Sequence, residues 1–265
     1  MGRAMTGGHL VWLFIRLGIL HELAYGANLI VQVGSSALGL AASLLFLGAV
    51  FARTETLAGW RAPELLAVLA SFYLLTGLLG MVVQPSLQAF IDDVLQGTFD
   101  FTLTRPRDAQ VLVSTERVDV WKLVDVGLGL GLLITAVMRL DGRVGPAQAA
   151  GFVVLLVAGA LTMYSCCLLL ATLAFWFLRM DHALIVFLSF WETGRWPVDV
   201  YPGWLRGILT FLVPVAFATT VPAQALTGHV QPATLLAAVG TAGGLLAVSR
   251  LVWLRGLRRY SGASA

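Results

Sequence analysis

Residues that could coordinate a metal ion or form a disulfide are few in this chain, and they do not cluster. The four histidines lie near the ends of apolar segments: His9, His21, His182 and His229. None belongs to a His-Glu-x-x-His pattern or accompanies a group of carboxylates, whereas a zinc site needs three or four converging ligands. Cys166 and Cys167 are adjacent in an apolar run, which suggests neither a disulfide framework nor a metal site. We therefore expect no bound metal and no cofactor on this chain.

Nucleophiles and nucleotide-binding loops also lack their usual context. Ser35, Ser36 and Ser189 have no Gly-x-Ser-x-Gly pattern around them and no evident base, so we interpret them as packing residues. There is no Gly-x-x-x-x-Gly-Lys-Ser/Thr loop, and the single lysine, Lys122, follows a tryptophan. Two glycine patterns favour close packing between helices rather than a dinucleotide loop: Gly127-x-Gly129-x-Gly131 and Gly240-x-x-x-Gly244. The chain is not expected to be an enzyme, and any ATP chemistry must come from another chain.

The composition is that of an all-α polytopic membrane protein. Of the 265 residues, 58% are hydrophobic and 12% are charged, and the mean hydropathy is +0.87. A soluble domain carries about 25% charged residues. The net charge of +3 is too small to indicate nucleic-acid binding, so we expect no nucleic-acid partner and interpret the arginines as topology signals.

The apolar sequence is interrupted by one polar segment, residues 85–119, which holds nine charged side chains. Placing them at a bilayer centre would cost on the order of 20 kcal/mol or more, so the segment must lie outside the hydrocarbon. Its first part has the spacing of an amphipathic helix, with apolar residues at Leu87, Phe90, Ile91, Val94 and Leu95. Gly97 is suited to end that helix, and Pro106 after Arg105 prevents a new one from continuing.

The apolar stretches on either side predict six transmembrane spans in a single domain, 1–265. The spans are expected at 28–51, 63–84, 120–140, 148–177, 182–196 and 231–254. Residues 9–26 predict an interfacial helix, or alternatively an extension of the first span. Residues 197–228 are rich in proline and predict a re-entrant outer segment, or alternatively a proline-kinked span. A re-entrant segment there is a candidate outer gate, comprising Pro197, Tyr201, Pro202, Pro214, Phe217 and Pro222.

The distribution of basic residues predicts the orientation of this six-span arrangement. One side would carry eleven of them: Arg3, Arg16, Arg105, Arg107, Arg117, Lys122, Arg179, Arg250, Arg255, Arg258 and Arg259. The other would carry six: Arg53, Arg61, Arg139, Arg143, Arg195 and Arg206. Because basic residues concentrate on the inner side, both termini and segment 85–119 are expected in the cytoplasm of a cell-membrane protein.

Two charged pairs lie within or close to predicted spans. Lys122 and Asp125 have i, i+3 spacing near the inner end of the third span, and Glu192 and Arg195 have the same spacing near the outer end of the fifth. Local pairing is the simplest interpretation, and a role in gating or proton coupling is the alternative. A secondary transporter or channel would rely on such groups, but their small number counts against that class.

Taken together, the chain resembles the membrane subunit of an ABC exporter of the type-2 permease family. Three stretches carry the resemblance: Gly97-x-x-Asp100-x-x-Leu103-x-Arg105-Pro106; Tyr201-Pro202 through Pro214-x-x-Phe217 to Pro222-Ala223; and Trp253 to Ser261, ending Arg258-Arg259-Tyr260-Ser261. The resemblance covers nearly the whole chain.

This resemblance implies a permease that works with partners. It would pair with a second permease subunit, identical or related, and with two cytoplasmic ABC ATPase subunits that bind ATP and magnesium. Segment 85–119 would contain the coupling helix that docks on an ATPase, with these residues at the contact: Phe90, Asp93, Gly97, Asp100, Leu103, Arg105 and Pro106. An apolar and aromatic lining would favour a hydrophobic or amphiphilic cargo such as a drug, a lipid or a natural product.

Overall fold

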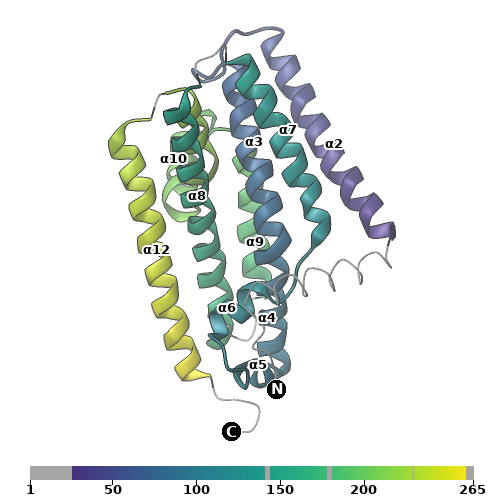
Figure 1. The fold of residues 1–265 in the computed structure, drawn as a ribbon, viewed down its shortest axis with the longest axis vertical. Coiled ribbons are helices and arrows are strands. Elements are labelled where there is room, and N and C mark those ends of the chain that lie inside the picture. Colours follow the sequence, from purple (N-terminus) through teal and green to yellow (C-terminus); the bar gives the residue numbers. More distant parts are fainter. Residues whose placement is uncertain (1–25, 141–143, 178–180, 229, 261–265) are drawn as a thin grey trace, which may run out of the picture.

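The computed structural model describes residues 26–140, 144–177, 181–228 and 230–260, and it is helical throughout this part of the chain (Figure 1). The only extended pairing among these residues is an isolated bridge between Leu57 and Trp60. The predicted interfacial helix, 9–26, lies outside the described residues except for Gly26. The all-α fold predicted from composition is confirmed.

Five helices are long and apolar enough to cross a membrane, and a bent pair brings the number to six among the described residues. The five include most of α2 (Gly26–Phe51), α3 (Ala62–Leu78) with its continuation, α7 (Leu123–Arg139), α8 (Pro146–Thr172) and α12 (Pro232–Arg259). Their bounds fall within a few residues of the predicted spans, with two exceptions: the second span continues to Gln96, and α12 extends five residues further than predicted, to Arg259.

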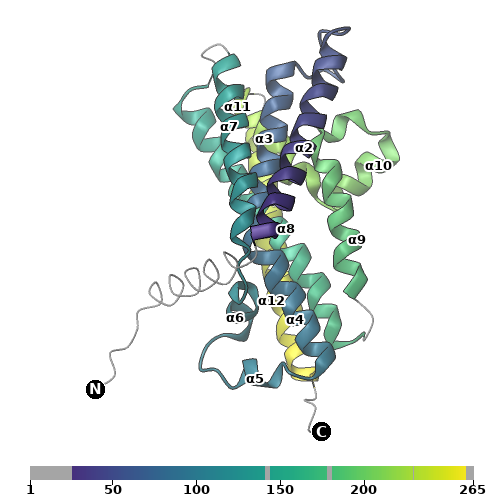
Figure 2. The same cartoon turned by 90° about the vertical axis from the view of Figure 1, so that its right-hand side faces the viewer.

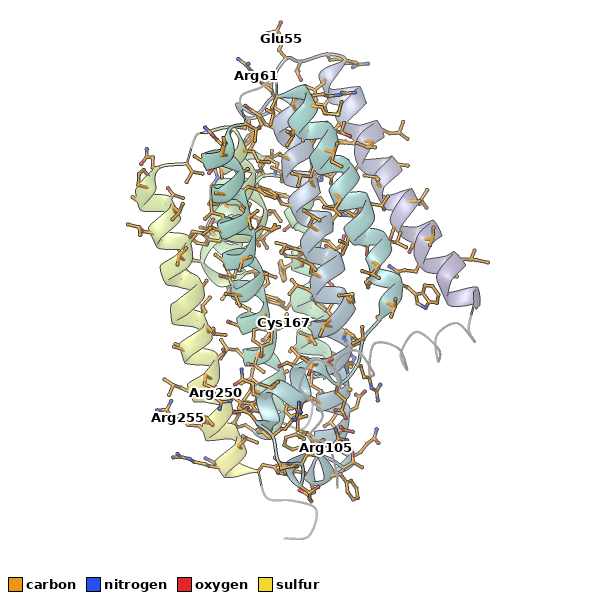
Figure 3. All side chains as sticks on the ribbon, viewed as in Figure 1. Glu55, Arg61, Arg105, Cys167, Arg250 and Arg255 are labelled. Carbon is orange, nitrogen blue, oxygen red and sulfur yellow. The ribbon has the colours of Figure 1, made fainter. Side chains whose placement is uncertain are left out.

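The helices run between two ends of an elongated bundle (Figures 1 and 2). The chain at α4 to α6 and the last turns of α12 lie at one end, which we call the base, and the loop joining α2 to α3 lies at the opposite end. Charged side chains follow the same division. Glu55 and Arg61 lie at the end opposite the base, whereas Arg105, Arg250 and Arg255 lie toward the base (Figure 3).

The second span is longer than predicted. Helix α3 passes through a π-helical stretch, η1 (Leu79–Val83), directly into α4 (Gln84–Gln96), and the continuous 35-residue run has a length of about 52 Å. This exceeds the roughly 30 Å of bilayer hydrocarbon, so α4 extends beyond it. The second span was predicted to end at residue 84, before the amphipathic helix. In the structure the span and the amphipathic helix form one continuous helix instead. The helix continues through Pro85, which lies directly after the π-helical stretch η1, where the regular hydrogen-bond pattern is already interrupted.

The predicted fifth span, 182–196, does not cross the membrane as one helix. It consists of α9 (Asp181–Trp191), about 16 Å long, and the 3₁₀ turn η4 (Glu192–Arg195). The crossing is completed by short elements: η5 (Val198–Val200), α10 (Gly203–Gly207), η6 (Ile208–Leu212), η7 (Ala216–Thr220) and α11 (Val221–Leu226). We call residues 192–226 the re-entrant region. Its two limbs, Gly203–Leu212 and Ala216–Leu226, meet at 80°, a bend that fits either a broken span or a re-entrant loop, so both predicted alternatives stay open.

Only some of the predicted packing glycines touch a neighbouring helix. A Cβ on Gly129 of α7 would lie 2.7 Å from the backbone nitrogen of Leu74 in α3, so glycine is required for these helices to approach. By contrast, nothing lies within 4 Å of the corresponding position on Gly127, Gly131, Gly240 or Gly244. Within this chain, the predicted packing role is confirmed for Gly129 and not for these four.

Candidate functional site

The polar segment folds into a compact turn at the base. Helix α4 ends at Gly97, whose φ of 72° is the left-handed conformation predicted for that position. The carbonyl of Asp93 accepts hydrogen bonds from the backbone amides of Thr98 and Phe99, and the Asp93 carboxylate accepts one from the Thr98 hydroxyl at 2.9 Å. Two short helices follow, α5 (Asp100–Leu103) and α6 (Ala109–Thr115). The Asp108 carboxylate caps α6 by accepting from the amide of Gln110.

Five aromatic rings hold this turn against the ends of α8 and α12. We call them the base cluster: Phe90, Phe99, Phe175, Trp253 and Tyr260. The ring centroids of Phe90 and Phe99 are 5.2 Å apart, and that of Trp253 lies 5.1 Å from Phe90. Phe90, Phe99 and Trp253 are fully buried. Such edge-to-face and tilted contacts add to the stabilisation from burial alone, so α4 and the turn are fixed to the bundle.

Polar contacts surround the base cluster and join segments distant in sequence. The Arg250 guanidinium of α12 pairs with the Asp108 carboxylate, with one contact at 2.9 Å, and also donates to the side-chain oxygen of Gln110 at 2.8 Å. Gln110 donates in turn to the hydroxyl of Tyr164 in α8. The hydrogen-bonded guanidinium of Arg250 lowers the pKa of Asp108. Burial, and then the negative charges of Asp100 and Asp93, raises the pKa of Tyr260.

The chain entering the base and the chain leaving it are also tied together. The hydroxyl of Ser86 in α4 donates to the carbonyl of Arg117 and accepts from its amide. The amide of Asp119 donates to the carbonyl of Met81, within the π-helical stretch, at 2.7 Å. A π-helical turn leaves carbonyls displaced from the regular helical pattern, and Asp119 supplies a donor to one of them. Segment 85–119 is thus a closed, braced loop.

The outermost part of the base is an exposed tip, residues 101–108, most of which is open to solvent. The Phe101 side chain is 73% exposed and that of Leu103 is 41% exposed. Arg105 and Pro106 are also exposed. The four residues therefore present apolar and basic groups on one short turn.

The structure separates the seven predicted coupling residues into two groups. Leu103, Arg105 and Pro106 lie at the exposed tip, where a partner could contact them. Phe90 is inside the base cluster, so it supports the tip from within instead of forming a contact surface. Three residues shape the turn or face it and are partly buried: Asp93, Gly97 and Asp100. Sequence reasoning missed Phe101, although an aromatic residue within a polar turn was a visible signal.

Beside the tip is a polar cleft of about 600 Å³ between α4 and α6. Three arginines and two carboxylates are among the residues that line it: Asp93, Arg105, Arg107, Glu116 and Arg117. Arg105 and Glu116 form an exposed ion pair at 3.4 Å. Because such exposed pairs contribute little to stability, this pair can exchange for contacts with a partner.

The predicted gate residues all belong to the re-entrant region, but they do not form one surface. Pro197, Pro214 and Pro222 are buried, Tyr201 and Phe217 are half-buried, and Pro202 is exposed. The Tyr201 hydroxyl donates to the carbonyl of Thr193 at 2.9 Å. The region is also fastened to the α2–α3 loop, because the Trp60 indole donates to the Asp199 carboxylate at 3.1 Å.

Both predicted charged pairs are present. Lys122 and Asp125 lie 3.5 Å apart, and Asp125 is buried. Glu192 and Arg195 lie 2.6 Å apart. The charge count assumed that Arg195 lies at the outer surface, and the structure contradicts this assumption. Arg195 lies beside Tyr73 of α3, eleven residues into that helix, because α9 ends far short of a full crossing.

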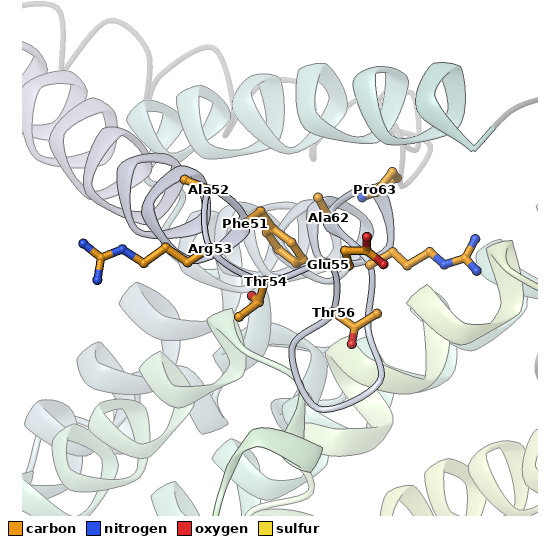
Figure 4. Close-up of a pocket in the computed structure, with 9 residues that line it drawn as sticks. Phe51, Ala52, Arg53, Thr54, Glu55, Thr56, Ala62 and Pro63 are labelled. Atoms are coloured by element: carbon orange, nitrogen blue, oxygen red, sulfur yellow. The ribbon is translucent and has the colours of Figure 1, made fainter.

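Two further features bear on chemistry. An open pocket of about 680 Å³ lies at the end opposite the base, lined by the α2–α3 loop and the first residues of α3 (Figure 4). In Figure 4 the side chain of Arg53 extends away from the other labelled side chains. Among the described residues, no three His, Cys, Asp or Glu side chains are placed to hold a metal ion.

The comparison with known families agrees with this architecture. A sequence model of the ABC-2 family transporter proteins matches residues 37–264, from the middle of α2 to the end of α12 and beyond. The chain belongs to the ABC-2 family. It is therefore the membrane component of an ABC transporter, and the proteins of this family are not themselves the ATPases. No curated protein and no solved structure matches the chain.

Two of the three stretches that carry the resemblance lie at the base: the turn from Gly97 to Pro106, and the end of α12 from Trp253 to Tyr260. The stretch from Tyr201 to Ala223 lies in the re-entrant region. The multi-pass membrane location follows from the helices and the family together.

Proposed function

We propose that the chain is the permease subunit of an ATP-driven exporter whose base docks on cytoplasmic ABC ATPase subunits. A second permease subunit, identical or related, and two ATPases would complete the assembly, with ATP and magnesium bound by the ATPases. The observation that carries this proposal is the exposed tip, with Phe101 and Arg105 outward, mounted on a base cluster in which Phe90, Phe99 and Trp253 are fully buried.

The mounting explains how movement would pass from an ATPase to the membrane. Helix α4 continues from α3 without a flexible linker, and Phe90 and Trp253 join it to α12. Close-packed aromatic side chains transmit displacement because they have little free volume to absorb it. A push on the tip would therefore move α3 and α12 together.

The orientation is supported by the basic residues whose elements the structure places. Eight lie on elements of the base or next to it: Arg105, Arg107, Arg117, Lys122, Arg250, Arg255, Arg258 and Arg259. Three lie at the opposite end, Arg53, Arg61 and Arg139, and two lie in the re-entrant region, Arg195 and Arg206. Under the positive-inside rule, the base would face the cytoplasm of the cell membrane.

A second subunit would cover the open faces of α2 and α12. Within residues 30–51, α2 buries only Ser43 and Leu47. Helix α12 leaves Gly240 and Gly244 open, and small residues of this kind allow membrane helices to approach closely. The passage between two such subunits would be largely apolar, which favours a hydrophobic or amphiphilic cargo.

Co-purification of the chain with a candidate ATPase tests the docking proposal. We expect the double substitution Phe101→Asp and Arg105→Glu to abolish recovery of the ATPase, because it removes the apolar and basic contacts of the tip. The matched control is Arg53→Glu at the opposite end, which should leave recovery unchanged. An intact complex with the substituted tip would contradict the assignment of the base as the docking site.

A further inference from the structure

Three groups from different elements meet inside the bundle, about a third of the way along the continuous helix formed by α3, η1 and α4. A Cβ on Gly39 of α2 would lie 3.4 Å from Nη1 of Arg195 and 3.4 Å from the hydroxyl of Tyr73. Tyr73 is 3% exposed, yet its hydroxyl has no hydrogen-bond partner within the described part of the chain, and neither does Nε of Arg195. Buried polar groups are normally paired, so unpaired donors on both residues beside a glycine point to a ligand.

The depth of this site is that of the middle of a bilayer. Tyr73 lies eleven residues after the start of α3, or about 17 Å, and Gly39 lies twelve residues before the end of α2, or about 18 Å. The hydrocarbon layer is about 30 Å thick. The Glu192 side chain, paired with Arg195, is 53% exposed on the outside of this chain. Because lipid does not accept an exposed carboxylate at this depth, Glu192 must face a water-filled passage or a partner subunit.

An apolar wall adjoins the charged pair. Phe72 and Trp191 stack with ring centroids 5.5 Å apart, and the Arg195 guanidinium carbon lies 5.3 Å from the centre of the Phe72 ring. On the other side, Phe46 of α2 contacts Trp196 edge-on at 4.7 Å. The site therefore combines a cation and a hydroxyl donor with aromatic surface able to receive a hydrocarbon chain.

We propose that this site binds the oxyanion head group of an amphiphile, which rests on the proposed function and names its cargo class as anionic. The head group would replace Glu192 on the Arg195 guanidinium, whose planar donors suit a carboxylate or phosphate, and the Tyr73 hydroxyl would donate to it. The tail would lie against Phe72 and Trp191. Glu192 is the competitor that holds Arg195 when the site is empty, and α2, which is loosely packed, is the element that would move aside for entry.

Direct binding of oleate to the protein in phosphatidylcholine nanodiscs tests this proposal without any ATPase. We expect Arg195→Gln to weaken oleate binding about tenfold or more, because a charge-assisted hydrogen-bonded pair is lost, and Tyr73→Phe to weaken it about threefold. Glu192→Gln should strengthen oleate binding several-fold, since the competing carboxylate is gone. Arg206→Gln, which removes the neighbouring ion pair with Asp199, is the matched control and should have no effect.

The opposite signs for Glu192 and Arg195 separate a binding site from a structural pair. If Glu192→Gln weakens oleate binding as Arg195→Gln does, or if oleyl alcohol binds as well as oleate, the proposal is overturned. Repeating the measurement in phosphatidylglycerol nanodiscs identifies which anion fills the site. If the wild type, but not Arg195→Gln, binds oleate more weakly there, the head groups of bilayer lipids also occupy the site. If oleate binding by the wild type is unchanged, the site selects the single-chain amphiphile. These binding measurements need no partner protein. The oleate proposal can therefore fail while the ATPase-docking proposal holds, and the docking proposal can fail while the oleate proposal holds.

Discussion

The base and the re-entrant region are built on opposite principles. At the base, large aromatic side chains from α4, α8 and α12 are packed together, and the polar groups at the rim pair across long sequence distances, as Arg250 does with Asp108. In the re-entrant region the backbone changes direction repeatedly through short 3₁₀ and π-helical turns.

The difference fits a division of labour in the molecule. A segment that transmits movement must be rigid. The base is rigid because aromatic side chains fill its interior and hydrogen bonds close its loop. A gate or binding region must have more than one arrangement of similar free energy, and irregular helical turns provide that. This contrast would be contradicted if substitutions at the base destabilised the protein no more than substitutions in the re-entrant region do.

The largest contrast is expected from removing one aromatic ring at each place. Trp253→Ala should destabilise the protein by about 3–5 kcal/mol, because the indole is fully buried between Phe90 and Phe175 and its removal leaves a cavity. Phe211→Ala, in η6, removes a ring that is 86% exposed within this chain and should change stability little. Thermal unfolding of both variants in the same detergent measures the difference, and equal losses would show that the base is not the rigid part.

A smaller contrast should follow from adding one methyl group. A Cβ on Gly256 of α12 would overlap the Phe175 ring, which cannot move within the base cluster, so Gly256→Ala should cost about 1–3 kcal/mol. Gly194→Ala in η4 would meet the Val215 methyl at 2.7 Å, the end of a short side chain in a region of irregular turns. Because Val215 is buried, we expect a cost here too, but a smaller one than for Gly256→Ala.

Gly240→Ala provides the control for these glycine substitutions, since nothing lies within 4 Å of the added methyl and alanine favours the helix. Its stability should equal or slightly exceed that of the wild type. Denaturation in a common detergent compares all three variants. A Gly194→Ala protein as unstable as Gly256→Ala would mean that the re-entrant region is packed as firmly as the base.

Sequence patterns predicted the membrane spans and the base better than the re-entrant region, for a physical reason. Span positions follow from hydropathy, and the end of α4 follows from Gly97, because both depend on a short stretch of residues. The apolar face of α4 was predicted from the helical spacing of its apolar residues, and Leu87, Phe90 and Ile91 are buried as that spacing indicated. What that face packs against could not be seen, because Trp253 and Phe175 are remote in sequence.

The re-entrant region was predicted only as a proline-rich interval. Its proline positions indicated irregular backbone, but the depth of Arg195 depends on where the eleven-residue α9 stops, and hydropathy does not distinguish a short helix from a full span there. The convergence of Gly39, Tyr73 and Arg195 joins three elements and leaves no local signal. The exposure of Phe101 at the tip likewise depends on the fold of the whole turn.

The smallest expected effect concerns the rim of the base and its response to pH. Asp108→Asn keeps an oxygen to cap α6, since asparagine caps about as well as aspartate, but it removes the negative charge that Arg250 contacts. Because the pKa of Asp108 is below its ordinary 3.8 in the folded protein, the negative charge stabilises the fold fully above pH 3.8, and this stabilisation is lost as the pH falls through the lowered pKa.

The side chains of Asp108 and Arg250 are both more than a third exposed, so solvent screening limits the effect to about 0.5–1 kcal/mol. Melting temperatures of wild type and variant should therefore differ at pH 6 and converge as the pH falls through the lowered pKa of Asp108. Glu116→Gln removes a charge from the longer, 3.4 Å pair with Arg105 and should have a smaller effect at pH 6. If the Asp108→Asn difference persists undiminished at low pH, the rim is held by the cap and not by the ion pair, and the base owes its rigidity to the aromatic cluster alone.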